Sequence, residues 1–284
     1  MVTAIITTYK RNANIVERAL CSVEKQTYKD IEILIIDDNE LGSAYTEGLK
    51  AMCNAHPAAR YLTQSGNKGA CSARNFGIAN AKGKYVAFLD DDDEWLPEKI
   101  ERQLEVIEEN EEIGMVYCCG YQYNSDKDTT DDYFNVRRFK KEISFDDLLE
   151  GDCIGTTSQP LIRKNVIEQA GGFWEELPAR QDYEMWIRIS MRARILGIKD
   201  KLFIHHIHDG EQISKSSKRA FVGYYNIYKR YYQYFQKNKA AKRAIVRNCY
   251  CASRGRDVFK QLRFGLMLAW YKLCDKMSGK AIRG

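Results

Sequence analysis

Several signals that identify common protein classes are missing from this 284-residue sequence. The nine cysteines form no CxxC pair and leave an odd one out, so neither a zinc site nor a disulfide framework is predicted. Met1–Ala4 leads into an apolar stretch without a preceding basic region, which is unlike a secretory signal. No window reaches the roughly 20 apolar residues of a membrane span. We therefore expect a cytoplasmic protein in a reducing environment.

Two phosphate-binding signatures are absent as well. The sequence contains neither GxGxxG nor GxxxxGK followed by Ser or Thr, which excludes the dinucleotide-binding and P-loop folds. Apolar strands nevertheless alternate with amphipathic helices, and this predicts an α/β fold with a Rossmann-like, mostly parallel sheet flanked by helices. The predicted strands are 2–7, 31–36, 60–63, 84–89, 115–123 and an extended stretch at 154–162; the predicted helices are 14–26, 43–54, 70–81, 98–110, 145–150, 165–170 and 183–191.

Four consecutive aspartates, Asp90 to Asp93, follow the apolar residues 85–89. They stand at the carboxyl end of a predicted strand, where open α/β sheets bind ligands. Mg²⁺ and Mn²⁺ prefer hard oxygen ligands of this kind. A turn that caps a helix start at 94–98 is the structural alternative, because Asp favours turns and caps. The run predicts a divalent metal ion at this end of the sheet.

Five motifs together resemble, in order and spacing, the family 2 inverting glycosyltransferases. They are IITTYKR at 5–11, IIDDN at 35–39, NKG with ARN within 67–75, the run 90–93, and Gln181-Asp182 before Met185-Trp186. The resemblance covers roughly residues 1–210. It implies a GT-A fold, a UDP-, GDP- or dTDP-sugar as donor with a UDP-sugar expected first, a saccharide or lipid-linked saccharide acceptor, and Mn²⁺ or Mg²⁺ as cofactor. One strand ending in Asp-Asp is common, whereas five ordered motifs are far more specific.

The resemblance also implies a division of the chain. Residues 1–113 would bind the nucleotide-sugar and residues 114–215 the acceptor, and together they would form the GT-A domain, 1–215. Residues 216–284 would be a helical extension, with a boundary near 214–218 where Ser and Lys crowd together.

Nucleotide-binding roles follow from the first three motifs. Thr7 and Tyr9 end the first strand, where a hydroxyl and an aromatic ring could meet a base or ribose, and Arg11 lies close enough to favour anionic groups. The resemblance gives Asp38 a hydrogen bond to the base and lets Arg74 reach back toward the nucleotide. The structural alternatives are a plain strand end for the first motif, a turn for Asp38 and a solvated helix face for Arg74.

The resemblance implies that Asp92 coordinates the metal ion and that Asp90 faces the ribose, with Asp91 also beside the nucleotide. The four-residue run allows a second register, in which Asp91 and Asp93 have the same spacing one residue later. Their side chains would then point to the opposite face of an extended backbone. Among the histidines at 205, 206 and 208, His208 best fits a family position that completes the metal or diphosphate shell, although imidazoles at this spacing are a weak metal signal.

Asp182 is the candidate catalytic base. Inverting transfer needs a carboxylate that takes the proton of the acceptor hydroxyl as it attacks the sugar. Many relatives carry Glu-Asp where this chain has Gln181-Asp182, but the base itself is kept. Because Asp182 opens a predicted helix, N-capping is its structural alternative.

The extension is rich in Tyr, Lys and Arg, and 259–272 combines apolar residues, among them Phe264, Leu266, Leu268 and Trp270, with Lys260, Arg263 and Lys272. We expect this extension to bind an anionic membrane surface, at the inner face of the plasma membrane, or to pack into a homodimer. No nucleic acid is expected as a partner. Two other functions compete with glycosyl transfer: a catalytically silent nucleotide-sugar-binding scaffold, and a nucleotidyltransferase, which would need a Gly-rich phosphate loop that this sequence lacks.

Overall fold

The computed structural model describes all residues except 65, 208–216, 254–260 and 272–284. Its centre is one ten-stranded sheet in the order β3-β2-β1-β4-β9-β6-β10-β5, with β7 beside β6 and β8 beside β10. The strands are β1 (Val2–Thr8), β2 (Ile31–Asp37), β3 (Ala59–Thr63), β4 (Tyr85–Asp90), β5 (Glu94–Trp95), β6 (Ile113–Asn124), β7 (Thr129–Asp132), β8 (Glu142–Ile143), β9 (Leu161–Arg163) and β10 (Arg194–Ile207).

The longer strands run in one direction. β1 is parallel to β2 and β4, β2 to β3, and β6 to β10. The short β9 is antiparallel to both β4 and β6, so these two also run parallel to each other. The predicted mostly parallel sheet is therefore confirmed, and the carboxyl ends of its main strands share one edge.

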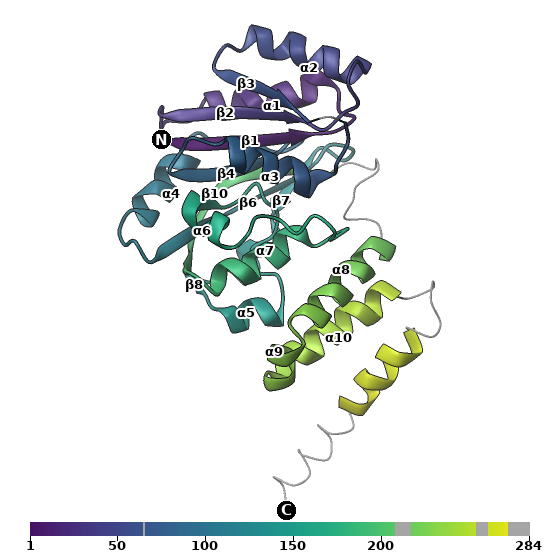
Figure 1. Ribbon diagram of the computed structural model, residues 1–284. Helices are drawn as coiled ribbons and strands as arrows, with labels where there is room; N and C mark the ends of the chain where they lie inside the picture. Colours follow the sequence, from purple (N-terminus) through teal and green to yellow (C-terminus); the bar gives the residue numbers. More distant parts are fainter. Residues whose placement is uncertain (65, 208–216, 254–260, 272–284) are drawn as a thin grey trace, which may run out of the picture.

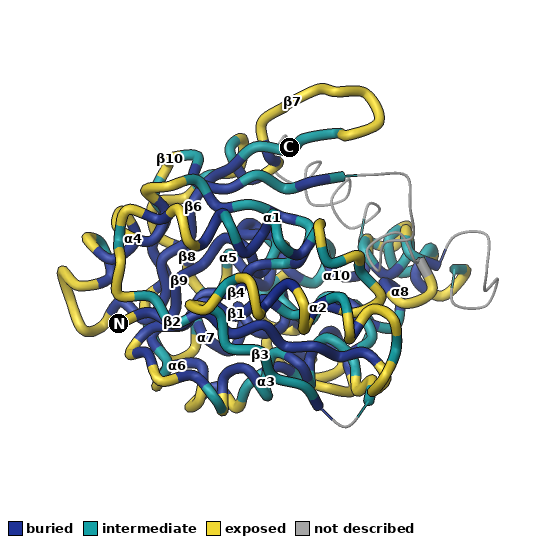
Figure 2. The backbone as a smooth tube through the Cα atoms, turned by 90° about the horizontal axis from the view of Figure 1, so that it is seen from above, coloured by how far each residue is buried: buried dark blue, intermediate teal, exposed yellow. Residues whose placement is uncertain are grey.

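Helices cover both faces of the sheet (Figures 1 and 2). Successive residues of β1 point to opposite faces: Ala4 and Ile6 join one buried cluster and Ile5 the other. The first cluster includes residues of α1, α2 and α4, and the second includes residues of α3, α5, α6 and α7. The helices are α1 (Ala13–Glu24), α2 (Ala44–Ala55), α3 (Ala70–Asn80), α4 (Lys99–Ile107), α5 (Phe145–Glu150), α6 (Lys164–Gln169) and α7 (Gln181–Ser190), and Phe134–Arg138 forms a 3₁₀ turn.

Three local expectations are wrong. Residues 94–98 do not begin a helix: Glu94–Trp95 is β5, which pairs with β10, and α4 begins at Lys99. The stretch 154–162 is mostly loop, with β9 alone extended. The fourteen-residue β10 was not expected, because polar residues at 199–201 interrupt its apolar pattern where its register against β6 shifts.

The predicted C-terminal helices are present as α8 (Ser217–Arg230), α9 (Tyr232–Lys237), α10 (Lys239–Ser253) and a helical segment at 261–271. Their apolar residues continue the cluster that contains Trp186 of α7. The Tyr231 hydroxyl also donates a 2.9 Å hydrogen bond to the buried Glu184. These helices thus pack against the sheet domain (Figure 1), and none in the described ranges is long and apolar enough to cross a bilayer.

Candidate functional site

The carboxyl ends of three neighbouring strands bring the first motifs together. β1 lies between β2 and β4, with Thr7 opposite Asp90 and Thr8 opposite Asp37. The predicted residues at the ends of these strands therefore meet at one edge of the sheet. Thr7 is half-buried there, while Tyr9 is 41% exposed just beyond the strand.

Asp38 and Asp37 have different surroundings. Both oxygens of Asp38 accept backbone hydrogen bonds, from Lys68 at 2.8 Å and Gly69 at 2.9 Å, which fixes the loop before α3. Each oxygen keeps a second lone pair that can accept from a ligand. Burial raises the pKa of Asp38, and these two bonds oppose that rise. Asp37 accepts from the Tyr61 hydroxyl at 2.6 Å and from the Asn39 side chain, so it holds the strand end.

Asp90 is the centre of a hydrogen-bond network. It accepts from Arg74 at 2.9 Å and from the hydroxyls of Thr156 and Thr157 at 2.7 and 2.9 Å. Burial alone would raise the pKa of Asp90, but Arg74 and the two hydroxyls lower it. Arg74 also lies over the ring of Phe173, with 5.4 Å to the centroid. The site thus holds an ionised Asp90 against a positioned guanidinium.

Arg11 contacts the middle of the aspartate run. Its Nε lies 3.0 Å from Asp91 and its Nη2 lies 2.9 Å from Asp92. Burial raises the pKa of Asp91 to about 7 in spite of Arg11, and burial together with Asp93 raises the pKa of Asp92. The positive charge of the Arg11 guanidinium therefore offsets the repulsion between the carboxylates at this edge of the sheet.

Asp93 faces the interior. Its carboxylate accepts from the Ser158 hydroxyl at 2.6 Å and from the His206 backbone, and it pairs with His205 Nδ1 at 3.0 Å. The side chains of Asp91 and Asp93 are 9% and 0% exposed, whereas those of Asp90 and Asp92 are 30% and 18% exposed. This alternation favours the register in which Asp92 meets a metal ion. His208 lies outside the described residues.

Asp93→Ala is expected to destabilise the fold. The substitution removes the partner of the half-buried His205 ring and leaves the Ser158 hydroxyl and the His206 backbone without their acceptor, and leaving buried donors unpaired costs about 1–3 kcal/mol. Urea unfolding followed by circular dichroism measures the change in the free energy of unfolding. Asp131→Asn on the exposed β7 is the matched control, with no change expected. A loss below about 1 kcal/mol for Asp93→Ala would contradict the interior role.

The contact between His205 and Asp93 predicts that the stability of the fold depends on pH. Burial lowers the pKa of His205, but Asp93 raises it to about 9. The unfolded imidazole has a pKa of about 6.5. Because the folded value is the higher one, the stabilisation is full below the unfolded value and is lost as the pH rises toward 9.

Asp182 lies in the first turn of α7, beside this network. The N-cap is Arg180, at φ 65°, so the N-capping alternative for Asp182 is wrong. One of its oxygens accepts from the Tyr183 backbone at 2.8 Å. Burial raises the pKa of Asp182 and Asp90 adds to this, while Arg180 and Arg74 oppose it. An ionised carboxylate with a raised pKa is a stronger base than a solvated one.

The loop between α5 and β9 contributes residues that the sequence did not single out. Thr156, Thr157 and Ser158 place their hydroxyls on Asp90 and Asp93. Asp152, from the same loop, has its pKa raised to about 7 by burial and by the charge of Asp182. The Thr-Thr-Ser run was a possible signal, but the loop has no periodicity that places it at the site.

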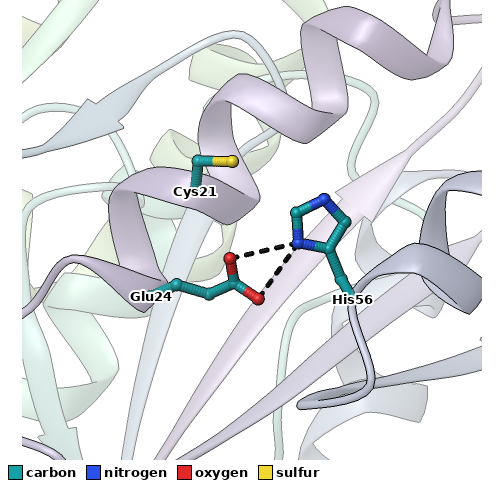
Figure 3. Close-up of side chains that lie close together, drawn as sticks. All are labelled: Cys21, Glu24 and His56. Atoms are coloured by element: carbon teal, nitrogen blue, oxygen red, sulfur yellow. Dashed lines mark hydrogen bonds and ion pairs between the residues drawn. The ribbon is translucent and has the colours of Figure 1, made fainter.

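A second cluster of metal-ligand residue types lies elsewhere, between α1 and the end of α2 (Figure 3). Cys21, Glu24 and His56 have ligand atoms within 4.8 Å of one another. His56 Nδ1 lies 3.1 Å from Glu24, and Nε2 lies 3.1 Å from Glu17. Hydrogen bonds to Glu17 and Glu24 raise the pKa of His56, which favours the protonated ring that cannot bind a metal. We therefore interpret this cluster as an ion-pair contact.

Comparisons with known sequences agree with these motifs. Residues 3–170 match the sequence model of Glycosyl transferase family 2. An uncharacterized glycosyltransferase of Rickettsia felis is 31% identical over 219 residues, which cover 76% of this chain and 35% of that protein, so the chain spans about a third of that relative. The putative colanic acid biosynthesis glycosyl transferase WcaA of Escherichia coli is 26% identical over 226 residues, covering 78% of this chain and 77% of WcaA.

Solved structures show the same fold. The S. aureus TarS structure with UDP-GlcNAc superposes with a TM-score of 0.63 at 17% identity, covering 80% of this chain and 66% of that one. The mannosyltransferase PcManGT of Pyrobaculum calidifontis, solved with GDP-Man and Mn²⁺, gives 0.62 at 16% identity, covering 98% and 83%. The predicted GT-A type fold is confirmed. Because the matching family model spans more than half of the chain, the protein belongs to glycosyl transferase family 2.

Proposed function

We propose that the protein is a metal-dependent inverting glycosyltransferase that moves a sugar from a UDP-sugar to the hydroxyl of a saccharide acceptor. The observation that carries the proposal is the position of Asp182. This carboxylate with a raised pKa lies close enough to Asp90 and Arg74 for their charges to act on it. This position supports the role of Asp182 as a base beside the predicted donor site.

Nucleotide binding is assigned to the strand ends. Tyr9 offers an exposed ring and Thr7 a hydroxyl, and Asp38 keeps lone pairs for a base. Arg74 and Arg11 supply positive charge toward a diphosphate. UDP is supported by the UDP-GlcNAc complex of TarS, although the structural relative PcManGT was solved with GDP-Man.

The residue types of the aspartate run suit a hard divalent ion. Carboxylate oxygens suit Mn²⁺ and Mg²⁺, and Asp92 lies on the less buried side of the run. Asp92 would hold the ion, with Asp90 and Asp91 beside the nucleotide and His208 as a predicted further ligand. When bound, the ion neutralises charge on the leaving diphosphate.

In the proposed reaction, Asp182 accepts the proton of the acceptor hydroxyl. The hydroxyl oxygen forms a bond to the anomeric carbon while the bond from that carbon to the diphosphate oxygen breaks, and the electron pair leaves with UDP. Attack opposite the leaving group inverts the configuration. One carboxylate suffices here, because arginines and the ion stabilise the departing charge.

The acceptor is assigned to residues 114–215, with the nucleotide-sugar at 1–113. The name of WcaA supports a place in polysaccharide or glycolipid biosynthesis, with a lipid-linked saccharide as one form of acceptor. Such an acceptor lies at a membrane surface, so an enzyme that uses it needs access to that surface.

A thermal-shift screen tests the donor and the ion together. We expect UDP with Mn²⁺ to raise the melting temperature more than GDP or dTDP does, because a ligand at 100 times its Kd adds about 2.7 kcal/mol to the stability of the native state. The same nucleotides with EDTA should give little shift. Equal shifts with and without the ion would contradict metal-dependent binding, and a larger shift with GDP would correct the donor.

A further inference from the structure

The last described helix, 261–271, has two different faces. Phe264 is buried, and Met267, Leu268 and Tyr271 pack against the main core cluster. This face fixes the helix to α8 and α10; the rings of Phe264 and Phe221 of α8, for example, are 6.0 Å apart. Phe264 and Leu268, which the sequence pattern grouped with membrane-facing residues, therefore point inward.

The opposite face of this helix exposes large apolar side chains. Leu262, Leu266 and Trp270 are 58%, 62% and 62% exposed. Their spacing of four residues places them along one side of the helix. Single exposed leucines are ordinary, but a row of three with a Trp at its end marks an interaction surface. We call these three residues the apolar row.

The helix that carries the apolar row and the helices before it are rich in basic residues. Between residues 217 and 256 the sequence has no Asp or Glu. Arg263 is exposed next to Leu262, one helical turn before Leu266. The exposed basic side chains on the preceding helices are Lys218, Arg219, Lys229, Arg230, Lys237, Lys239 and Arg247. The positive charge of these side chains is larger than the net charge of the whole chain, which is +5. The rest of the chain therefore has a negative net charge, and the positive charge is concentrated in these helices.

We propose that the C-terminal helices dock on an anionic phospholipid surface, with the apolar row entering the boundary between headgroups and acyl chains. Such a surface attracts basic side chains and takes up exposed apolar ones, and the C-terminal helices offer both: the apolar row with Arg263 on 261–271, and exposed Lys and Arg on α8, α9 and α10. A second copy of the chain fits less well. Two copies meeting through these helices would bring positive surfaces together without an acidic partner, because 217–256 contains none.

The docked helices are joined firmly to the site. Gly223 of α8 lies against Ala179, where any Cβ would collide with the Ala179 carbonyl. The next residue, Tyr224, has its ring under Arg180, 4.8 Å from the guanidinium carbon. Asp182 follows Arg180 by two residues in the chain. Docking would thus hold Asp182 near the membrane, where a lipid-linked acceptor lies; this last step rests on the proposed function, whereas the docking itself does not.

Vesicle co-sedimentation of the full chain tests the docking. The probes are vesicles of phosphatidylcholine alone and of phosphatidylcholine with phosphatidylglycerol. We expect binding to the second kind only, weakening as salt rises, because attraction amounts to about 1 kcal/mol per basic residue near the surface. Replacing the apolar row by Ser should weaken binding about tenfold or more. Leu41→Ser is the matched control, since Leu41 is also 62% exposed but lies after β2.

Three outcomes would overturn the proposal: equal binding of wild type and the triple variant, equal binding to both vesicles, or no binding together with a dimer that the triple variant breaks in sedimentation analysis. The last outcome would assign the row to a homodimer. The melting temperature of the triple variant without nucleotide provides the fold control. Because neither this control nor vesicle binding requires UDP or Mn²⁺, failure of docking stays separate from failure of the proposed transfer activity.

Discussion

Asp182→Asn is expected to lower kcat by about 10²–10⁴-fold while the affinity for UDP with Mn²⁺ stays near the wild-type value. The amide keeps the shape of the side chain and can still accept from the Tyr183 backbone, but it cannot take a proton. Initial rates of UDP release in the presence of acceptor measure kcat, and calorimetry measures UDP binding. A large loss of kcat without a loss of UDP affinity is the result that identifies a base.

Two variants make this result specific. Asp131→Asn removes an exposed carboxylate on β7 and should leave kcat unchanged. Asp152→Asn removes a neighbouring buried carboxyl whose pKa the charge of Asp182 helps to raise, but it keeps the proposed base, so kcat should fall far less than with Asp182→Asn. Transfer by Asp182→Asn at a near wild-type rate would eliminate Asp182 as the base.

Asp92→Asn is expected to abolish the part of UDP affinity that depends on the metal ion. An amide oxygen is neutral and binds Mn²⁺ far more weakly than a carboxylate, so we expect a loss of about 100-fold, or about 3 kcal/mol. Calorimetric titration of UDP with Mn²⁺ should then give the Kd that the wild type shows in EDTA.

Asp91→Asn tests whether Asp92, and not its neighbour, holds the ion. If Asp92 holds the ion, Asp91→Asn should keep a difference between Mn²⁺ and EDTA, because the Asp91 side chain lies on the more buried side of the run. If Asp91→Asn removes that difference and Asp92→Asn keeps it, the ligand is Asp91 and the assignment is wrong.

The fold of the first strands, β1, β2 and β4, was predictable because its signals are local. β1, β2 and β4 are runs of Ile, Val, Ala and Phe that end in hydroxyls or carboxylates, and parallel strands bring such ends to one edge. β1, for example, was predicted to end one residue before its observed end at Thr8. The residue types at these ends then predicted which side chains meet.

Other elements were less predictable because their structure depends on distant partners. β5 is two residues long and extended only because β10 pairs with it. Thr156 and Thr157 lie in a loop without periodicity, and their hydroxyls meet Asp90 across more than 60 residues of chain. Asp152 lies in the same loop, so its position close to Asp182 had no signal in the sequence.

The anomeric configuration of the product tests the central claim most directly. Proton NMR would follow the product formed from an α-linked UDP-sugar, a saccharide acceptor and Mn²⁺. The account predicts a β-linked product with the wild-type protein, and none with Asp182→Asn or in EDTA. An α-linked product, or equal transfer by Asp182→Asn, would contradict it.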